Sequence, residues 1–322
     1  MKKSFVALLF AALAPLILAP AFAQGFPSHA LRLIVPYPPG ASTDILGRAV
    51  AEKMTQSLGQ PVVVENKGGA SGNIGSQLAA AAAPDGYTFM VGTDATHAAN
   101  YHLTASLPFH PLKDFTPLTL AVSNPIVLVV HPSVPAKNIA ELVEYVKARP
   151  DKGAFGSSGI GSPHHLAGEL LRQMSGAPFV HVAYRGGGPA MTDVLGGQIP
   201  MVFASVVTAL PHIQEGKVRA IAVTTTKRYV GLPDVPTIAE TIPGFEMNSW
   251  LAFFAPAGLS PELTKKLNAE IVKALEDPAV HEKMNKGGLV VVASSPEEFA
   301  AQQRRDFEQR GKLIQSAGIK AE

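Results

Sequence analysis

The sequence predicts an α/β protein made of two lobes, and three observations support this. Short apolar runs alternate with Gly-rich turns and helical patterns, an order typical of parallel sheets with helical crossovers. Two strand-to-helix corners of the same form lie far apart, YPPGASTDILGR at Tyr37–Arg48 and FGSSGIGSPHHLAGE at Phe155–Glu169. The 322 residues are also enough for two domains of ordinary size, each with its own core.

Residues 1–23 have the form of a signal peptide. Two lysines precede an apolar stretch, and an Ala-Phe-Ala motif ends at Ala23, where a signal peptidase requires small residues. An uncleaved membrane anchor is the alternative, and it is disfavoured because Pro15 and Pro20 interrupt the stretch. We therefore expect export and cleavage after Ala23.

Composition excludes several classes of protein. The chain has no cysteine, which excludes disulfides, thiol catalysis and a lipid-modified N-terminal cysteine. Of its 27 Lys and Arg residues, two lie in the signal peptide, so the remainder balances the 25 Asp and Glu residues. A neutral mature chain disfavours nucleic acid and membrane surfaces as partners, because both attract an excess of positive charge. We expect a free soluble protein, a monomer.

Three strands are expected in the first lobe, each ending in a turn rich in Gly, Ser or Thr. They lie at Leu31–Pro36, Val62–Asn66 and Tyr87–Gly92. Helices are expected after the first two, at Asp44–Ser57 and Ile74–Ala83, because apolar residues recur there with helical spacing. Strand, turn and helix in this order predict a parallel sheet.

The chain is expected to cross between the lobes twice. A long apolar run, Pro117–His131, is interrupted by Asn124-Pro125 and is the candidate first crossing. The apolar strand SWLAFFAP at Ser249–Pro256 carries the chain back. The predicted first lobe is therefore discontinuous. The lobes are assigned to residues 24–124 with 249–322, and to residues 125–248.

The second lobe repeats the alternation of strands and helices. Its expected elements are a helix at Leu142–Ala148, a strand at Gly153–Gly156, a helix at His165–Met174, a strand and a helix opened by Pro189 within residues 180–197, and strands at Ile199–Ala204 and Val218–Thr224. Two tail helices follow the return strand, Pro261–Leu275 capped by Ser260 and Glu297–Ser316, and both are expected to pack on the first lobe.

The first corner is a candidate anion site. Ser42, Thr43 or Asp44 can cap the helix, while Gly40 and Ala41 leave room for a ligand to approach the backbone. A capped helix with no ligand is the ordinary alternative, since one helix N-terminus contributes only about 0.3–1 kcal/mol to anion binding, and up to about 2 when partly buried. A second corner of the same form on the other lobe favours a two-sided clamp for one negatively charged ligand.

The second corner carries hydroxyl groups and two histidines. Its glycines and serines match neither the dinucleotide-binding fingerprint nor the lysine-bearing phosphate loop, so no cofactor is predicted. His164 and His165 are adjacent and point in different directions on a helix, and no H-E-x-x-H motif is present, so no metal site is predicted. One histidine is expected to cap the helix or hydrogen-bond the ligand, and the other to be exposed.

An exported serine hydrolase is the competing class. No G-x-S-x-G motif occurs, and the serines of the second corner have no identifiable base or orienting carboxylate. The residues offer many hydrogen-bond donors and no activated nucleophile. We therefore predict no catalytic residues and interpret the chain as a binding protein.

Arg185 lies beside three glycines in AYRGGGPA. It could pair with a ligand carboxylate through two hydrogen bonds, or brace the loop through a structural ion pair, and the residues leave both open. Thr93, Asp94 and Thr96 follow the third strand of the first lobe and could line the same cleft.

Seven ordered segments resemble one known family, the extracytoplasmic substrate-binding proteins of tripartite tricarboxylate transporters, also called the Bug family. The segments are VPYPPGASTDILGR, VENKGGASGNIG, PDGYTFMVGT, FGSSGIGSPHHLAGELL, VAYRGGGPAMTDVLGGQIPMVF, RAIAVTTTKRYVGLPDVPTIAE and SWLAFFAPAGLSPEL. They run through essentially the whole mature chain, which is far more specific than any single motif. The chain departs from many members at Ala41, where they have a second glycine.

The resemblance implies a two-lobed periplasmic binding protein fold (type II) with two crossing hinge strands and a ligand cleft between the lobes. It implies that backbone N–H groups and ordered waters hold a ligand carboxylate as a pincer. The implied positions are Tyr37, Pro39, Gly40, Ala41, Ser42 and Asp44 in the first lobe, and Ser157, Ser158, Gly161, Ser162, Pro163 and His164 in the second, with Thr93, Ala204 and Ser205 in further cleft loops.

The function expected from residues and resemblance together is capture of a small organic anion in the periplasm and its delivery to membrane transporter subunits. The anion is left open among mono- and dicarboxylates, acidic amino acids and aromatic acids. A sensor subunit that presents bound ligand to a receptor would use the same site. Closure is expected as a hinge motion at the crossings near Asn124 and Trp250.

Overall fold

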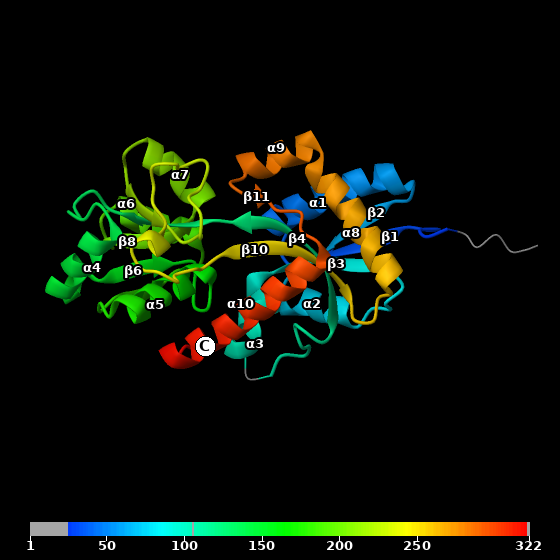
Figure 1. Cartoon of the computed structure of the whole chain (residues 1–322), viewed down its shortest axis with the longest axis horizontal. Helices are drawn as coiled ribbons and strands as arrows, with labels where there is room; N and C mark the ends of the chain where they lie inside the picture. Colours follow the sequence, from blue (N-terminus) through cyan, green and yellow to red (C-terminus); the bar gives the residue numbers. More distant parts are fainter. Residues whose placement is uncertain (1–24, 105, 321–322) are drawn as a thin grey trace, which may run out of the picture.

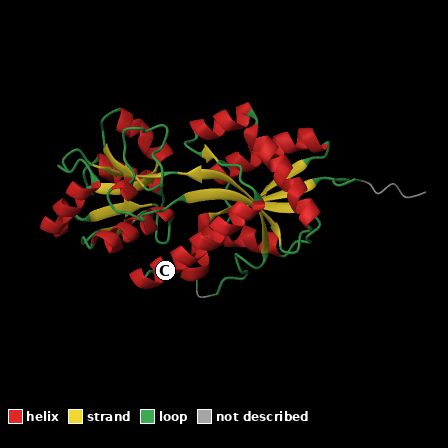
Figure 2. Ribbon diagram, viewed as in Figure 1, coloured by secondary structure: helices red, strands yellow, loops and turns green. Residues whose placement is uncertain are grey.

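Two separate β-sheets form the two halves of the molecule (Figures 1 and 2). The computed structural model describes residues 25–104 and 106–320. The predicted signal peptide lies outside the described residues. Within them, no helix combines the length and apolar character needed to cross a membrane.

The first sheet has six strands in the order β11-β4-β10-β3-β1-β2. Strands β1, β2 and β3 are parallel to one another, as predicted. Strand β10 lies between β3 and β4 and runs antiparallel to both. The bounds are β1 Leu31–Val35, β2 Val62–Asn66, β3 Thr88–Thr93, β4 Phe115–Asn124, β10 Ser249–Pro256 and β11 Val290–Val291. The short edge strand β11 was not predicted.

Helices cover this sheet and close a core around Leu33, Phe89 and Phe253. Ser260 caps α8 as predicted, with its Oγ accepting from the Leu263 N–H at 3.2 Å. The bounds are α1 Ser42–Leu58, α2 Asn73–Ala80, α8 Pro261–Glu276 and α9 Pro278–Lys286, and a π-helical turn at Ala95–Ala99 continues into α3 Asn100–Leu103. Neither α9 nor the π-helical segment was predicted.

The second sheet has five strands in the order β7-β6-β8-β5-β9. Strand β5 runs antiparallel to both β8 and β9, whereas β6 is parallel to β7 and β8. The bounds are β5 Ile126–Val130, β6 Ala154–Ser157, β7 Val180–Ala183, β8 Met201–Ser205 and β9 Arg219–Val223, with helices α4 Ile139–Ala148, α5 Pro163–Ser175, α6 Gly187–Leu195 and α7 Val206–Gln214. Helix α7 was missed.

The two crossings lie where the sequence placed them. Strand β4 ends at Asn124 in the first sheet and β5 begins at Ile126 in the second, so Pro125 separates them. Asn124 pairs with Ser249, the first residue of the returning strand β10. Proline lacks the N–H that would continue a strand ladder, which explains why the apolar run splits here.

The last helix, α10 (Pro296–Ala317), packs on the first lobe as predicted and also reaches the core of the second sheet, which was not predicted. Phe299 packs with Trp250 in a separate apolar cluster of the first lobe, whereas Leu313 and Ile314 belong to the core of the second sheet. The helix has 22 residues and is therefore about 33 Å long, which lets one helix contact both lobes. In Figure 1 it runs from beneath the first sheet to the second lobe.

Candidate functional site

A cleft of 470 Å³ lies between loops of the two sheets. The first lobe contributes the loop between β2 and α2 and the residues of α3, and the second contributes the loops after β6 and β7. Its lining residues are Ser71, Asn73, Asn100, Leu103, Thr104, Gly159, Ile160, Ala183, Tyr184 and Arg185. Ligands of open α/β sheets usually bind beyond the carboxyl ends of the strands, and this cleft lies at such a place.

The loop between β2 and α2 reaches the cleft in a constrained conformation. Ala70 and Ser71 have φ angles of 47° and 55°, in the left-handed region that non-glycine residues rarely adopt. The Ser71 carbonyl accepts hydrogen bonds from the Tyr37 hydroxyl at 3.3 Å and from Asn100 Nδ2 at 3.2 Å. The same Asn100 Nδ2 donates to Asn73 Oδ1 at 2.8 Å. The loop is thus held from both sides with Ser71 and Asn73 at the cleft.

These three cleft residues were missed by sequence reasoning. Ser71 and Asn73 lie in KGGASGN, which has the glycine and hydroxyl composition of the two corners and follows a strand as they do. That pattern was the available signal. Asn100 carried none, because its position depends on the unpredicted π-helical turn before α3.

The first corner leaves the start of α1 without a side-chain cap. Ala41 is the N-cap residue, so the prediction that Ser42, Thr43 or Asp44 caps the helix was wrong. Asp44 instead accepts from the Gly40 N–H at 2.9 Å. An uncapped N-terminus retains free N–H donors, which is what an anion would use.

The Asp44 carboxylate braces this corner. Besides Gly40, it accepts from Asn66 Nδ2 at 2.9 Å and pairs with Arg48 Nε at 2.9 Å. Burial pushes the pKa of Asp44 upward, but the hydrogen bonds from Arg48, Gly40 and Asn66 together bring it below its usual value. Because these three partners occupy the carboxylate, Asp44 holds the loop and its charge is neutralised locally.

Thr93, Asp94 and Thr96, at the end of β3, are not among the residues that line the cleft. Thr93 Oγ1 lies 3.3 Å from the Tyr37 hydroxyl and 3.2 Å from Thr96 Oγ1. Asp94 is buried, and its Oδ1 accepts from Ser249 Oγ at 3.0 Å, which places it at the returning crossing. Burial raises the pKa of Asp94 to about 6. These residues therefore support the cleft and the crossing from within.

The helix of the second corner is capped by a serine and not by one of the two histidines. Ser162 caps α5 by accepting from the His165 N–H at 3.2 Å, and Pro163 is the first helical residue. The prediction that one of the two histidines is exposed was wrong, because His164 and His165 are only 8% and 5% exposed. Each contacts a different part of the corner loop.

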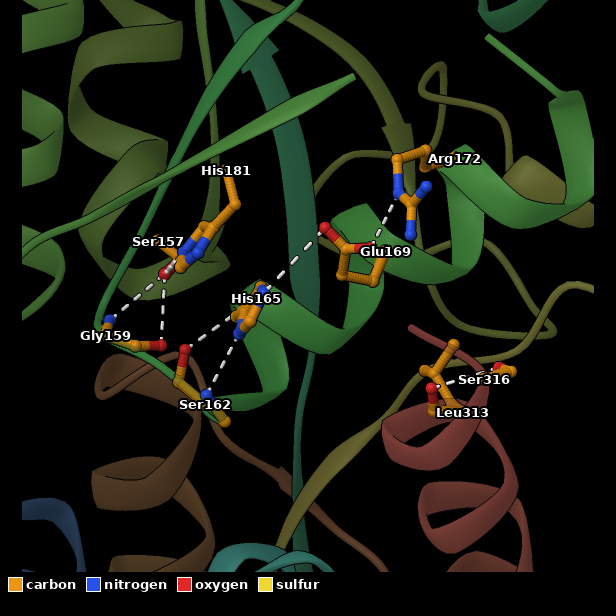
Figure 3. A network of polar contacts seen from close by, with 10 residues as sticks. Ser157, Gly159, Ser162, His165, Glu169, Arg172, His181, Leu313 and Ser316 are labelled. Carbon is orange, nitrogen blue, oxygen red and sulfur yellow. Dashed lines mark hydrogen bonds and ion pairs between the residues drawn. The ribbon is translucent and has the colours of Figure 1, made fainter. Parts of the chain in front are cut away.

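One polar network holds this loop against the sheet (Figure 3). His165 Nδ1 accepts from the Gly161 N–H at 3.0 Å, and its ring stacks on His181 with centroids 3.6 Å apart. His181 Nε2 lies 2.6 Å from Ser157 Oγ, which also contacts the Gly159 N–H and carbonyl at 3.1 and 3.2 Å. The loop from 157 to 161 is therefore fixed before any ligand arrives.

A second set of contacts joins Ser158 to the crossing. His164 Nδ1 lies 2.6 Å from Ser158 Oγ, and His164 Nε2 lies 3.2 Å from Ser205 Oγ. Ser205 Oγ in turn accepts from Asn124 Nδ2 at 3.3 Å. Burial lowers the pKa of His164 to about 4, so the imidazole is neutral near pH 7.

The two Ser–His contacts supply bases that sequence reasoning did not find. Ser157 meets His181 and Ser158 meets His164, but neither imidazole has a carboxylate partner among the described residues. Burial lowers the pKa of His181 to about 4 as well, which makes both weak general bases at neutral pH. Within the described ranges, no group of three or more His, Cys, Asp or Glu residues could hold a metal ion.

Arg185 is the cation of the cleft. It is exposed, and within residues 25–104 and 106–320 it makes no ion pair, whereas its neighbour Tyr184 donates to Asp193 at 2.7 Å. Arg185 therefore has no carboxylate in the described residues with which to brace the loop, which was one of its two predicted roles. The guanidinium remains available to a ligand.

The matching family is that of the tripartite tricarboxylate transporter receptors, whose model covers residues 46–319. The chain belongs to this family. Its curated relatives include BugT of Bordetella pertussis, 35% identical over 306 residues that cover 94% of each chain. The predicted membership of the Bug family is thereby confirmed.

Solved structures of receptors agree with the predicted two-lobed fold. The periplasmic binding protein BugD is 35% identical with a TM-score of 0.73, over 92% of this chain and 100% of its own. Rpa4515 of R. palustris, solved with adipate, is 32% identical with a TM-score of 0.77, over 92% and 99%. MatC of Rhodopseudomonas palustris, solved with malate, is 32% identical with a TM-score of 0.73, over 90% and 100%.

The other residues predicted to contact the ligand lie in different surroundings. Gly161 packs closely on Leu103 of the other lobe, since a Cβ there would lie 2.2 Å from Leu103 Cδ1. Ala204 is 1% exposed in the core of the second lobe, so only its backbone could reach a ligand. Pro39 and Ser42 lie at the first corner and stay predictions as ligand contacts.

Proposed function

We propose that this receptor captures a small organic carboxylate between its two lobes in the periplasm and delivers it to a tripartite tricarboxylate membrane transporter. The observation that carries the proposal is the cleft between the sheets, which Arg185 of the second lobe lines together with the amide side chains of Asn73 and Asn100 from the first. The adipate and malate bound by two relatives support it. Release and capture would follow from hinge motion at the crossings near Asn124 and Trp250.

Dicarboxylates are the first ligands to test. Adipate and malate each carry two carboxylates, and the cleft of 470 Å³ lies within the range of about 300–1,000 Å³ usual for small-molecule sites. One carboxylate would lie at the loop of the second corner, beside Gly159. The uncapped helix start of the first corner does not line this cleft, so lobe closure would have to bring it to the same carboxylate. The other carboxylate would lie toward Arg185.

The deciding experiment is a thermal-shift screen of mature protein that has been unfolded and refolded to remove carried-over ligand. The panel holds mono-, di- and tricarboxylates, acidic amino acids and aromatic acids, with neutral sugars as controls. A ligand at a hundredfold excess over its Kd should stabilise the fold by about 2.7 kcal/mol. Stabilisation by sugars alone, or by nothing, would contradict carboxylate capture.

Replacing Arg185 by alanine is expected to weaken binding of the best dicarboxylate by about tenfold to a hundredfold, the loss usual for a hydrogen bond to a charged group. Arg185→Lys is the matched control, because it keeps the charge but loses the paired hydrogen-bond geometry. Its affinity should lie between those of the wild type and Arg185→Ala. Titration calorimetry measures both. Equal affinity in all three proteins would remove Arg185 from the site.

We also propose that the protein is not an enzyme. The Ser157–His181 and Ser158–His164 contacts favour a hydrolase, so ester hydrolysis should be assayed directly. We expect no turnover of small carboxylate esters. Turnover that is abolished by Ser158→Ala would support the hydrolase instead.

A further inference from the structure

The contacts from Asn124 to Ser158 form a continuous hydrogen-bonded chain between the crossing and the second corner. Asn124 is the last residue of β4 in the first sheet, and Ser205 is the last residue of β8 in the second. The Asn124–Ser205 bond of 3.3 Å therefore joins the two lobes. The Val206 N–H donates to the Pro125 carbonyl at 2.9 Å beside it, which holds Ser205 against the crossing.

Two directions of this chain use the Ser205 hydroxyl both as a donor and as an acceptor, because His164 is neutral and carries one N–H. A third arrangement, in which Ser205 accepts from both Asn124 and His164, would leave the Ser205 proton without an acceptor among the described residues. In the forward direction, Asn124 donates to Ser205, Ser205 donates to His164 Nε2, and His164 Nδ1–H donates to Ser158. In the reverse direction, Ser158 donates to His164 Nδ1, Nε2–H donates to Ser205, and Ser205 donates to the Asn124 Oδ1. Only the forward direction leaves the Ser158 hydroxyl proton unused within the chain.

The burial of the Asn124 amide selects between the two directions. In the structure Nδ2 donates to Ser205, and Oδ1 is buried with no partner among the described residues. Turning the amide would leave Nδ2 buried and unpaired instead. Unpaired buried N–H groups are rarer in proteins than unpaired carbonyl oxygens, so the forward direction is favoured.

We propose that Asn124 is a positioning residue that, through Ser205 and His164, holds the Ser158 hydroxyl as a hydrogen-bond donor to the ligand. Ser158 precedes Gly159, which lines the cleft, and its side chain has no acceptor other than His164 in the described part of the chain. This role rests on the proposed function, since the acceptor would be a ligand carboxylate. Asn124 itself touches no ligand and acts only through its neighbours.

The direct test reads the proton on His164 in the ligand-free protein. Histidine ¹⁵N signals are recorded at pH 8, and His164→Gln assigns the relevant ring among the ten histidines. We expect the Nδ1–H form in the wild type. In Asn124→Asp, the carboxylate can only accept, so the chain should reverse and the Nε2–H form should appear.

Asn248→Asp is the matched control for added charge. Asn248 lies at the other crossing with its Oδ1 also buried and unpaired among the described residues, but its Nδ2 donates to Glu246 and, within those residues, it makes no hydrogen bond to the chain that leads to His164. This variant should keep the Nδ1–H form. An Nε2–H form in the wild type, or no difference between the wild type and Asn124→Asp, would overturn the proposal.

Affinity provides the second readout, with adipate and malate as the probes. Asn124→Asp should weaken the better probe by about tenfold to a hundredfold relative to Asn248→Asp, because Ser158 would present a lone pair instead of a proton. In a Ser158→Ala background the same substitution should add nothing, and additive losses would overturn the proposal. If neither probe binds the wild type while His164 still reverses, the choice of these dicarboxylates as ligands falls, and the control of the His164 proton by Asn124 stands.

Discussion

Replacing Gly75 by alanine is expected to destabilise the protein by about 1–3 kcal/mol, the usual cost of an extra methyl group in a tightly packed site. A Cβ at Gly75 would lie 2.6 Å from the Lys67 carbonyl oxygen and 2.8 Å from Pro36 Cα. Both neighbours are backbone atoms at the ends of strands, so neither can rotate away. Helix α2 would have to move off the sheet, and Asn73 would leave the cleft with it.

Urea unfolding and dicarboxylate titration measure the two consequences of this substitution. Gly188→Ala is the matched control, because it also lies in a helix but has nothing within 4 Å of the added Cβ. It should gain up to about 1 kcal/mol from helix propensity. If Gly75→Ala were as stable as Gly188→Ala, the close packing of α2 on the strand ends would be refuted.

Stability is expected to fall steeply as the pH drops below about 6.5. Burial lowers the pKa to about 3 for His97 and His165 and to about 4 for His164 and His181. The unfolded chain, with its ordinary pKa near 6.5, therefore binds more protons in this window. The stability that depends on neutral imidazoles is complete above about pH 6.5 and is lost as the pH falls through 4 and then 3.

Asp94 acts in the opposite direction. Its pKa is raised from 3.8 to about 6, so the folded state binds the extra proton between these values. Its contribution is present below 3.8 and is lost as the pH rises through 6. Four histidines against one carboxyl leave a net loss on acidification, with each group worth at most about 1.4 kcal/mol per pH unit. Urea unfolding at pH 7, 6 and 5 measures the slope.

His97→Phe isolates one of these groups. The His97 ring stacks on Phe254 with centroids 3.9 Å apart, and its Nε2 is buried without a partner among the described residues, so phenylalanine suits the site. The variant loses the contact of Nδ1 with Thr96. Its free energy of unfolding should depend less steeply on pH than that of the wild type, because one titrating histidine has been removed. Equal stability at pH 7 and pH 5 in the wild type would contradict the assignment of neutral buried histidines.

Local patterns predicted most of the strands and the crossings. The proline at 125 that separates β4 from β5, the Ser260 cap before α8 and the three parallel strands all follow from residues next to one another in the chain. Small elements escaped prediction, because β11 has 2 residues and the π-helical turn has no distinctive spacing. Tertiary pairing determines such elements.

The sequence by itself determined the two-lobed α/β class, the family and the two corners, because strands, turns and helix starts depend on local backbone chemistry. Only the tertiary structure decided which side chains meet. Asn124 and Ser205 lie 81 positions apart and form one bond, as do Asn100 and Ser71 at a separation of 29. Helix α10 likewise joins two cores. Such contacts depend on how sheets and helices pack in three dimensions, which local spacing does not encode.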